Sequence, residues 1–157
     1  MSQTTRATLF LQQQGIAFAL ASYTYDPSAD SIGLAAAEAL GVPPRRVLKT
    51  LMVLADGMPA CAVLPSDHEL SLKKMAAACG AKSAAMMKPE EAERISGYHI
   101  GGISPFGQKK RAPVVLELAA LSEDRVYLNG GQRSLQVLLA PGDIIRVLNA
   151  VAASITA

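Results

Sequence analysis

Cysteine and histidine are both scarce in this sequence, with two of each among 157 residues. Cys61 and Cys79 are too far apart for a CxxC motif, and neither stands beside a histidine. Zinc and similar metals are held by such residues at close, characteristic spacings. We therefore expect no metal and no other cofactor, and two thiols that stay reduced and pack in the interior.

Long apolar runs are also missing. The longest unbroken apolar stretches reach about half of the ~20 residues that a membrane-spanning helix needs, or less. The segment 1–6 lacks a basic stretch that leads into a long apolar one, so we find no secretory signal. These absences predict a soluble, cytoplasmic protein with no membrane partner.

The sequence has little excess charge, since 15 Lys and Arg residues against 13 Asp and Glu give a net charge of +2. This balance does not by itself indicate a nucleic-acid-binding protein, so any basic contact surface must come from local clustering. Half of the residues are apolar and 18% are charged, which excludes the disordered and fibrous classes. The length fits a single domain over residues 1–157.

Residue periodicity and capping signals predict both helices and strands. Ser31 and Ser71 are N-cap residues of helices that end at Gly41 and Gly80. Further helices are expected at 4–14, from Pro89 onwards, and from Pro141 or Asp143 onwards. Strands are expected at residues 16–24, 47–54, 58–64, 82–86, 114–118, 125–128 and 135–139.

Two turns and the number of strands decide the fold class. Ala55-Asp56-Gly57 is a strong hairpin signal, and Asp26-Pro27-Ser28 is a polar turn. The strands outnumber those of a simple βαβ series. We therefore predict an α+β fold with a mixed or largely antiparallel sheet, curled and barrel-like, surrounded by helices.

The segment 97–111 is the least like a regular element, with four glycines, one proline, one serine and three consecutive cations at its end. Glycine lets a ligand approach the backbone and tolerates a positive φ, so such a loop can present amides to a carbonyl or a phosphate. It can equally be an irregular connection with a solvated basic end, because glycine-rich loops alone are weakly specific.

Lys49 lies within a predicted strand, on the same face as Val47, Leu51 and Val53 by strand alternation. One interpretation is a lysine near a strand end whose stem runs along apolar surface to solvent. The other is a lysine in a partly buried cavity that holds a carboxylate, phosphate or ester oxygen by charge-assisted hydrogen bonds.

Motifs for the usual ester-cleaving chemistries are missing. There is no HExxH or HxE spacing and no GxSxG elbow. The two histidines, His68 and His99, are assigned no role. Hydrolysis by an activated side-chain nucleophile or a metal-bound water therefore has no support in the sequence.

Several segments together resemble a known family. They are Lys49-Thr50-Leu51, Leu70-Ser71-Leu72-Lys73-Lys74, the glycine segment from Gly97-Tyr98 to Lys109-Lys110, and Asn129-Gly130-Gly131-Gln132-Arg133 followed by Gly142-Asp143. Over nearly its whole length the chain resembles the YbaK/EbsC family of aminoacyl-tRNA deacylases, which is related to the editing domain inserted in bacterial prolyl-tRNA synthetases. The resemblance implies the same fold, a mixed sheet that closes toward a barrel with helices around it.

The resemblance also implies an activity. Members of the family act in trans-editing, in which a free-standing protein removes cysteine from tRNA mischarged by prolyl-tRNA synthetase. Cysteine and proline have similar volumes, so a synthetase pocket cannot strongly exclude one of them. In the mechanism attributed to the family, the substrate's own thiol attacks its ester and leaves as a thiolactone. The protein then supplies mainly orientation, which is worth about 7–11 kcal/mol in well-aligned intramolecular reactions.

By the same resemblance, Lys49 binds the terminal ribose or phosphate and positions the ester, beside Thr50. The amides of Gly101 and Gly102 face the substrate carbonyl, with help from Ser104, whose hydroxyl could instead bond its own loop.

Tyr23 lines the pocket in this scheme, and Tyr25 is a competing candidate. The expected partner is the 3′ end of a mischarged tRNA, with prolyl-tRNA synthetase as a possible second partner. Phosphate contacts are assigned to Lys74, Lys109, Lys110 and Arg133, each of which could equally be a solvated surface cation.

Three positions depart from the family pattern. Ser134 replaces a glycine, Gln136 replaces an acidic residue, and Ile32 replaces an aromatic pocket residue. Ile32 and Gln136 are still predicted to contact the substrate. These changes leave open a deacylase for alanine or another small amino acid, a non-catalytic module that binds tRNA or a synthetase, and an anion-binding protein unrelated to translation.

Overall fold

The computed structural model describes residues 4–24, 28 and 31–157. The helices are α1 (Arg6–Gln13), α2 (Ile32–Leu40), α3 (Leu72–Ala78), α4 (Pro89–Ser96) and α5 (Pro141–Leu148), with short 3₁₀ turns η1 (Pro44–Arg46) and η2 (Leu118–Ser122). The strands are β1 (Ala19–Ser22), β2 (Leu48–Ala55), β3 (Met58–Pro65), β4 (Ala84–Met86), β5 (Val114–Glu117), β6 (Val126–Asn129), β7 (Leu135–Leu139) and β8 (Val151–Ala153).

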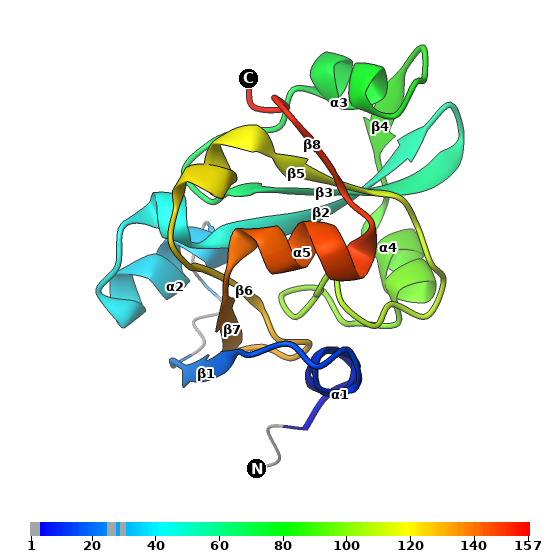
Figure 1. The fold of residues 1–157 in the computed structure, drawn as a ribbon. Coiled ribbons are helices and arrows are strands. Elements are labelled where there is room, and N and C mark those ends of the chain that lie inside the picture. Colours follow the sequence, from blue (N-terminus) through cyan, green and yellow to red (C-terminus); the bar gives the residue numbers. More distant parts are fainter. Residues whose placement is uncertain (1–3, 25–27, 29–30) are drawn as a thin grey trace.

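The described strands form two sheets (Figure 1). The larger sheet has the order β4-β2-β3-β5-β8, antiparallel among β4, β2 and β3 and parallel from β3 to β8. The smaller sheet, β1-β7-β6, is antiparallel. An isolated parallel bridge between Val47 and Tyr127 brings β6 alongside the start of β2. The mixed α+β fold predicted from the sequence is confirmed, but the sheet is divided and no closed barrel is formed by the described strands.

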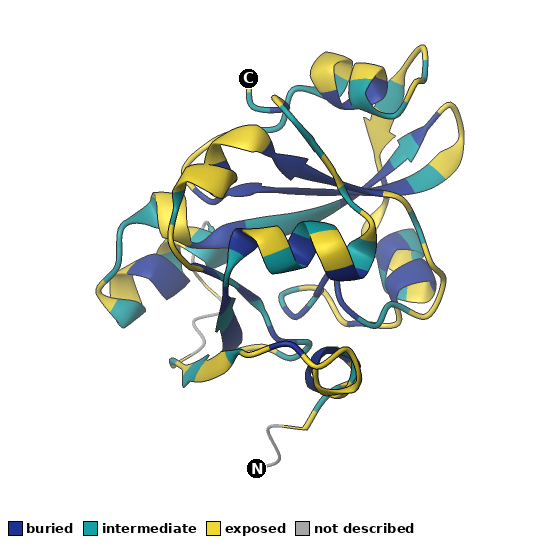
Figure 2. Cartoon of the chain, viewed as in Figure 1, coloured by how far each residue is buried: buried dark blue, intermediate teal, exposed yellow. Residues whose placement is uncertain are grey.

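Both faces of the larger sheet are buried, and β3 and β5 are dark along most of their length in Figure 2. On one face, Leu48, Met52 and Val63 pack with the smaller sheet, α1 and α5 in one core. On the other face, Val53 and Leu64 pack against α3. Alternation along each strand divides its side chains between these two cores.

The predicted caps and the hairpin are confirmed. The Ser31 side chain accepts from Leu34 N–H, the Ser71 side chain accepts from Lys74 N–H, and Gly41 ends α2 in the left-handed conformation. Asp56 and Gly57 both have positive φ, as a tight hairpin turn requires. Strand β8 is not predicted from the sequence, and the predicted turn at 26–28 lies mostly outside the described residues.

Candidate functional site

A cavity of about 310 Å³ opens where β2 separates from β6. Its wall is mostly apolar, and its larger polar side chains are those of Lys49, Thr50, Asn129 and Gln136. The other lining residues are Ser31, Ile32, Gly33, Val47, Leu48, Leu51, Met52, Met86, Met87, Pro89, Ala92, Ile100, Gly101 and Ile103.

The strand ladders explain why a cavity forms here. β2 pairs with β3 along its whole length, but β4 pairs only with Val53–Ala55. At the other end, β6 pairs with the same edge only through the Val47–Tyr127 bridge, just before β2 begins. Among the described strands, none covers the outer edge of β2 around Thr50, and this edge forms one wall of the cavity. Ligands commonly bind where neighbouring strands diverge in this way.

Lys49 lies at the start of β2, next to the end of β3, and it lines the cavity. Burial lowers the pKa of its ammonium group, and the nearby Glu69 and Asp67 carboxylates partly oppose this shift. The environment therefore disfavours the charged form while leaving it two counter-charges. Such a partly desolvated cation interacts strongly with an anionic or polar oxygen placed beside it.

Two polar atoms in the cavity wall have no hydrogen-bond partner within the described part of the chain, namely Thr50 Oγ1 and Gln136 Oε1. Both atoms are buried, and Gln136 as a residue is only 4% exposed. A buried acceptor without a partner costs about 1–3 kcal/mol. A ligand that supplies a donor to these atoms would recover that cost.

Asn129, by contrast, has a hydrogen-bond partner within the protein at each end of its side-chain amide. Its Nδ2 donates to the carbonyl of Gly101 at 3.1 Å, and its Oδ1 accepts from Gly131 N–H at 2.7 Å. The side chain thus joins the two glycine-containing loops behind the cavity. It is a positioning residue that the sequence motif contained but for which no role was predicted.

The glycine segment reaches the cavity only at Ile100, Gly101 and Ile103. The Ile100 amide donates to Glu93 Oε2 at 2.8 Å, and the Gly102 amide donates to the His99 carbonyl at 2.8 Å. Gly102 is buried and does not line the cavity. The prediction that both glycine amides face a ligand therefore fails at Gly102, because its N–H closes a turn within the loop.

Gly102 is needed for packing instead. A Cβ at this position would lie 3.0 Å from backbone atoms of Gln132 and Arg133, in the second glycine-containing loop. The Arg133 Nε also donates to the Ile100 carbonyl at 3.0 Å across the same contact. We expect Gly102→Ala to push the two loops apart and to cost about 1–3 kcal/mol of unfolding free energy. Chemical denaturation measures this cost; Gly142→Ala, where a Cβ meets no atom within 4 Å, is the control and should leave stability nearly unchanged.

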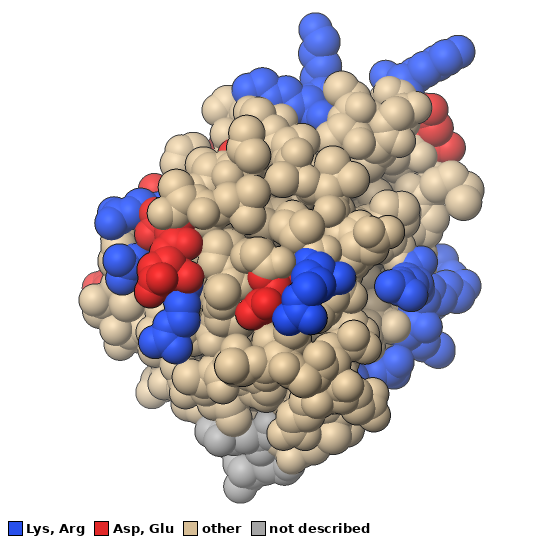
Figure 3. Space-filling model, viewed as in Figure 1, with Lys and Arg blue, Asp and Glu red and all other residues tan. Residues whose placement is uncertain are grey.

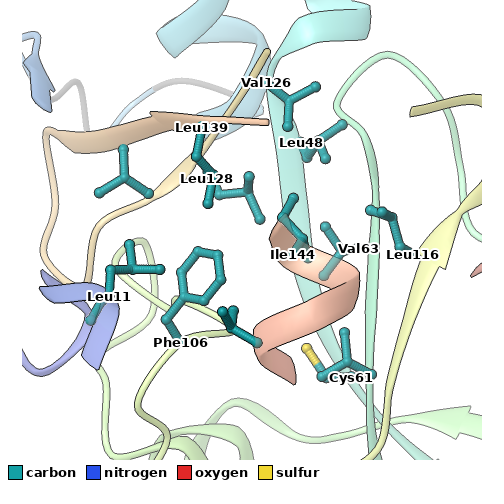
Figure 4. Packing of buried hydrophobic residues seen from close by; sticks show 14 of the residues in the cluster. Leu11, Leu48, Cys61, Val63, Phe106, Leu116, Val126, Leu128, Leu139 and Ile144 are labelled. Atoms are coloured by element: carbon teal, nitrogen blue, oxygen red, sulfur yellow. The ribbon is translucent and has the colours of Figure 1, made fainter. Parts of the chain in front are cut away.

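Ser104 lies in the interior rather than in the cavity wall. Its hydroxyl accepts from Phe106 N–H at 3.2 Å, and the residue is 0% exposed. This is the alternative in which the serine bonds its own loop. Phe106 itself enters the core with its ring directed toward Leu128, beside Leu11 (Figure 4), and stacks on Phe10 at a centroid distance of 6.3 Å. The glycine segment is therefore anchored to the hydrophobic core through Phe106.

Helix α2 meets the cavity only with its first residues, Ser31, Ile32 and Gly33. A Cβ on Gly33 would lie 2.5 Å from the Cβ of Ser66, so glycine allows the helix to begin against the loop that follows β3. The predicted contact residue Ile32 is thus in the cavity wall, at the positive end of the helix dipole.

Two further predicted residues that the structure describes, Tyr23 and Lys74, are not among those that line the cavity. Tyr23 packs with Val47 and Tyr127 under α2. Tyr25, the competing candidate, lies outside the described residues. Lys74 donates to the Thr156 carbonyl on the α3 side of the molecule, at 2.8 Å.

The other predicted phosphate contacts lie within or beside the glycine segment 97–111. Lys109 and Lys110 are exposed, with backbone amides bonded to the end of α4, and Arg133 lies beside Ile100. Figure 3 shows Lys and Arg side chains gathered on the side where α4 lies and a second group near α3. Helix α4 supplies Pro89 and Ala92 to the cavity wall, whereas no residue of α3 lines it.

No sequence pattern predicted the apolar wall of the cavity. Met52, Met86 and Met87 come from β2, β4 and the residue after β4, and they meet Ile100 and Ile103 from the glycine segment. These residues are far apart in sequence and carry no motif. Only the pairing of β2 with β4 brings them together.

The described residues provide neither a metal centre nor a membrane-spanning helix. No group of three or more His, Cys, Asp and Glu side chains among them could hold a metal ion. In the same part of the chain, no helix has both the length and the apolar character required to cross a bilayer.

Comparison with known proteins assigns the chain to a family. The family model described as "Aminoacyl-tRNA editing domain" matches residues 26–147. The chain belongs to this family. Among its relatives is a protein of Enterococcus faecalis named "Putative Cys-tRNA(Pro)/Cys-tRNA(Cys) deacylase EbsC", 34% identical over 98% of this chain and 94% of that protein.

The chain is also similar to part of a tRNA ligase and, in its fold, to a solved structure. Proline–tRNA ligase of Acidithiobacillus ferrooxidans is 36% identical over 85 residues, which are 54% of this chain and 15% of the ligase. A crystal structure described as "a putative trans-editing enzyme for prolyl tRNA synthetase" superposes with a TM-score of 0.83 over 100% of this chain and 98% of that chain, at 20% identity. This last similarity establishes the fold alone.

Proposed function

We propose that the protein is a trans-editing deacylase that clears cysteine from mischarged tRNA(Pro). The observation that carries the proposal is one cavity lined by both Lys49 and Gly101, in a chain similar over nearly its whole length to a protein named as a Cys-tRNA deacylase. The substrate is the aminoacylated 3′ end of the tRNA. Such a protein works in the cytoplasm, and prolyl-tRNA synthetase is its proposed partner.

The cavity supports chemistry by the substrate rather than by a side-chain nucleophile. Among the lining residues that the structure describes, none is a cysteine, histidine or carboxylate, and the hydroxyls belong to Ser31 and Thr50. Ser31 Oγ already accepts from the amide of Leu34. A general base for activating water is therefore missing from this wall.

In the proposed reaction, the thiol sulfur of the cysteinyl group attacks its own ester carbonyl carbon. The new S–C bond closes a thiolactone, the ester C–O bond breaks, and the ribose oxygen leaves with the proton from the thiol. The protein contributes by holding the thiol and the carbonyl in reacting geometry, which accounts for large rate increases without an acid or base.

The residues take distinct roles in this proposal. Lys49 binds an oxygen of the terminal ribose or phosphate and stabilises the negative charge that develops at the ester. The Gly101 region and Ile32 close the two ends of the site, and Arg133, Lys109 and Lys110 contact the tRNA backbone on the α4 side. Lys74 is distant from this surface and is the weakest of the four predicted phosphate contacts.

A matched pair of substrates tests the reaction. We expect rapid deacylation of cysteinyl-tRNA(Pro) and a rate at least about 100-fold lower for its S-methylcysteinyl counterpart, in which one added methyl group blocks the nucleophilic thiol. Alanyl- and seryl-tRNA(Pro) should likewise resist the protein. The measurement is release of the labelled amino acid, with trapping of the thiolactone before it opens in water.

Each of the opposite results favours a particular alternative. Cleavage of alanyl- or seryl-tRNA at the cysteinyl rate would replace the thiolactone route by attack of water. Binding of all these tRNAs without cleavage would make the protein a non-catalytic module.

A further inference from the structure

The two atoms without partners in the cavity wall are both able to accept a hydrogen bond. Gln136 lies in β7, where it pairs across the smaller sheet with Asn129 and Ala21, and Thr50 lies on the open edge of β2. Within the described residues, neither Gln136 Oε1 nor Thr50 Oγ1 has a protein donor, whereas the neighbouring Asn129 has both ends of its amide occupied. These two acceptors therefore need a hydrogen-bond donor, which a ligand can supply.

The charge of the wall restricts the kind of donor. Within the part of the chain that the structure describes, Lys49 is the one charged residue that lines the cavity, and no carboxylate is among the lining residues. Asp67 and Glu69 influence Lys49 electrostatically, but they are not lining residues. A ligand ammonium group would therefore lose its hydration beside another cation, without an anion to replace the water.

The backbone of Thr50 adds further polar groups to this part of the cavity wall. The Met52 carbonyl accepts from Met87 N–H, so the peptide groups of Met52 point away from β3. In an antiparallel ladder this direction alternates, and the N–H and C=O of Thr50 point to the same open edge. The Thr50 peptide and hydroxyl thus lie on the cavity side of β2, and the Gln136 amide lies in the wall that β7 contributes.

We infer that Gln136 and Thr50 bind the α-substituent of the aminoacyl group as an uncharged hydrogen-bond donor, so that the site takes the neutral amine rather than the ammonium form. The inference rests on the proposed function and names how that site recognises its substrate. It makes Gln136 a specificity-determining residue. An acidic residue at this position would favour the ammonium form, and glutamine removes that preference.

Three thiol-bearing substrates test this recognition with the unmodified protein. They are cysteinyl-tRNA(Pro), the analogue with a hydroxyl in place of the amino group, and the analogue with hydrogen there. Each rate is divided by the spontaneous rate of the same ester in buffer. We expect the amino and hydroxyl substrates to agree within about threefold in kcat/KM and the hydrogen analogue to be about tenfold poorer, the loss of one buried hydrogen bond.

Two variants of the same residue give opposite expectations. Gln136→Glu should prefer the amino over the hydroxyl substrate by about tenfold or more, because the new carboxylate pairs with an ammonium group. Gln136→Leu should lose the discrimination against the hydrogen analogue. Gln13→Glu, on the exposed face of α1, is the control for the added charge and should behave as the unmodified protein.

The results separate this inference from the proposed function. If the unmodified protein cleaves cysteinyl-tRNA(Pro) but prefers amino over hydroxyl by more than tenfold, or accepts the hydrogen analogue equally well, the inference is wrong and the function stands. If none of the three esters is cleaved, the proposed function is wrong and the inference falls with it. The substrate series needs no variant, so misfolding of Gln136→Glu cannot hide the answer.

Discussion

Replacing Lys49 by methionine should reduce kcat/KM for cysteinyl-tRNA(Pro) by at least about 100-fold, the scale of losing one charged or polar group that stabilises an ester transition state. Methionine keeps much of the length and apolar stem of lysine, so the loss reports the ammonium group rather than a new hole in the wall. The measurement is single-turnover deacylation. Lys73→Met, on an exposed position of α3, is the matched control and should retain the activity.

The same variant has an expected stability that distinguishes function from folding. Burial lowers the pKa of Lys49, which means that the folded protein disfavours the charged ammonium at neutral pH. Removing this charge should leave the thermal midpoint unchanged or raise it. Activity of Lys49→Met within threefold of the unmodified protein would eliminate the proposed role, and a large fall in thermal midpoint would mean that the lysine acts in folding.

Replacing Glu117 by alanine should have the largest effect on stability. Glu117 is 4% exposed, and its carboxylate accepts from the backbone amides of Ala119 at 2.8 Å, Ile155 at 2.8 Å and Thr156 at 3.2 Å. These bonds tie the residues after β8 to the end of β5. Three amides without a partner should cost about 3–5 kcal/mol in unfolding free energy, or about 10 °C in thermal midpoint.

The control and the pH dependence make this prediction specific. Glu38→Ala, on the exposed side of α2, should stay within about 0.5 kcal/mol of the unmodified protein. Burial tends to raise the pKa of Glu117, but the amide bonds outweigh it and lower the pKa below the ordinary 4.5. The stabilisation is therefore complete above pH 4.5 and is lost as the pH falls from there through the folded-state pKa. Glu117→Gln should lack this part of the acid-dependent loss, and an unchanged acid profile would contradict the role.

The parts of the fold that local chemistry determines were predictable from the sequence. Ser31, Gly41 and the Asp56-Gly57 turn act within a few residues, so their signals identified the ends of α2 and the β2–β3 hairpin. Strand β8 was missed because it has three residues and owes its existence to parallel pairing with β5. The division into two sheets likewise depends on which distant strands pair, which periodicity does not encode.

In the site too, the features set by local sequence were predictable and those set by long-range contacts were not. Of the residues that alternation predicted on the same face as Lys49, Leu51 and Val53 pack in or against the α3-side core, whereas Val47 packs with α2. The direction of individual amides in the glycine segment depends on the turn that Gly102 closes with His99, and the sequence could not specify it. A role for the Gln136 acceptor could not be predicted from the sequence, because it depends on β7 and β2 lining the same cavity.

The methionines of the cavity wall have a consequence for selectivity. Thioether side chains are unbranched and adapt to the shape beside them, so a wall made of Met52, Met86 and Met87 gives poor steric exclusion. Small aminoacyl groups of different outline should fit this wall almost equally well. Discrimination among them must then come from their reactivity and from their hydrogen bonds with the site. Replacing these methionines by stiff, β-branched residues would instead make the protein select substrates by their shape.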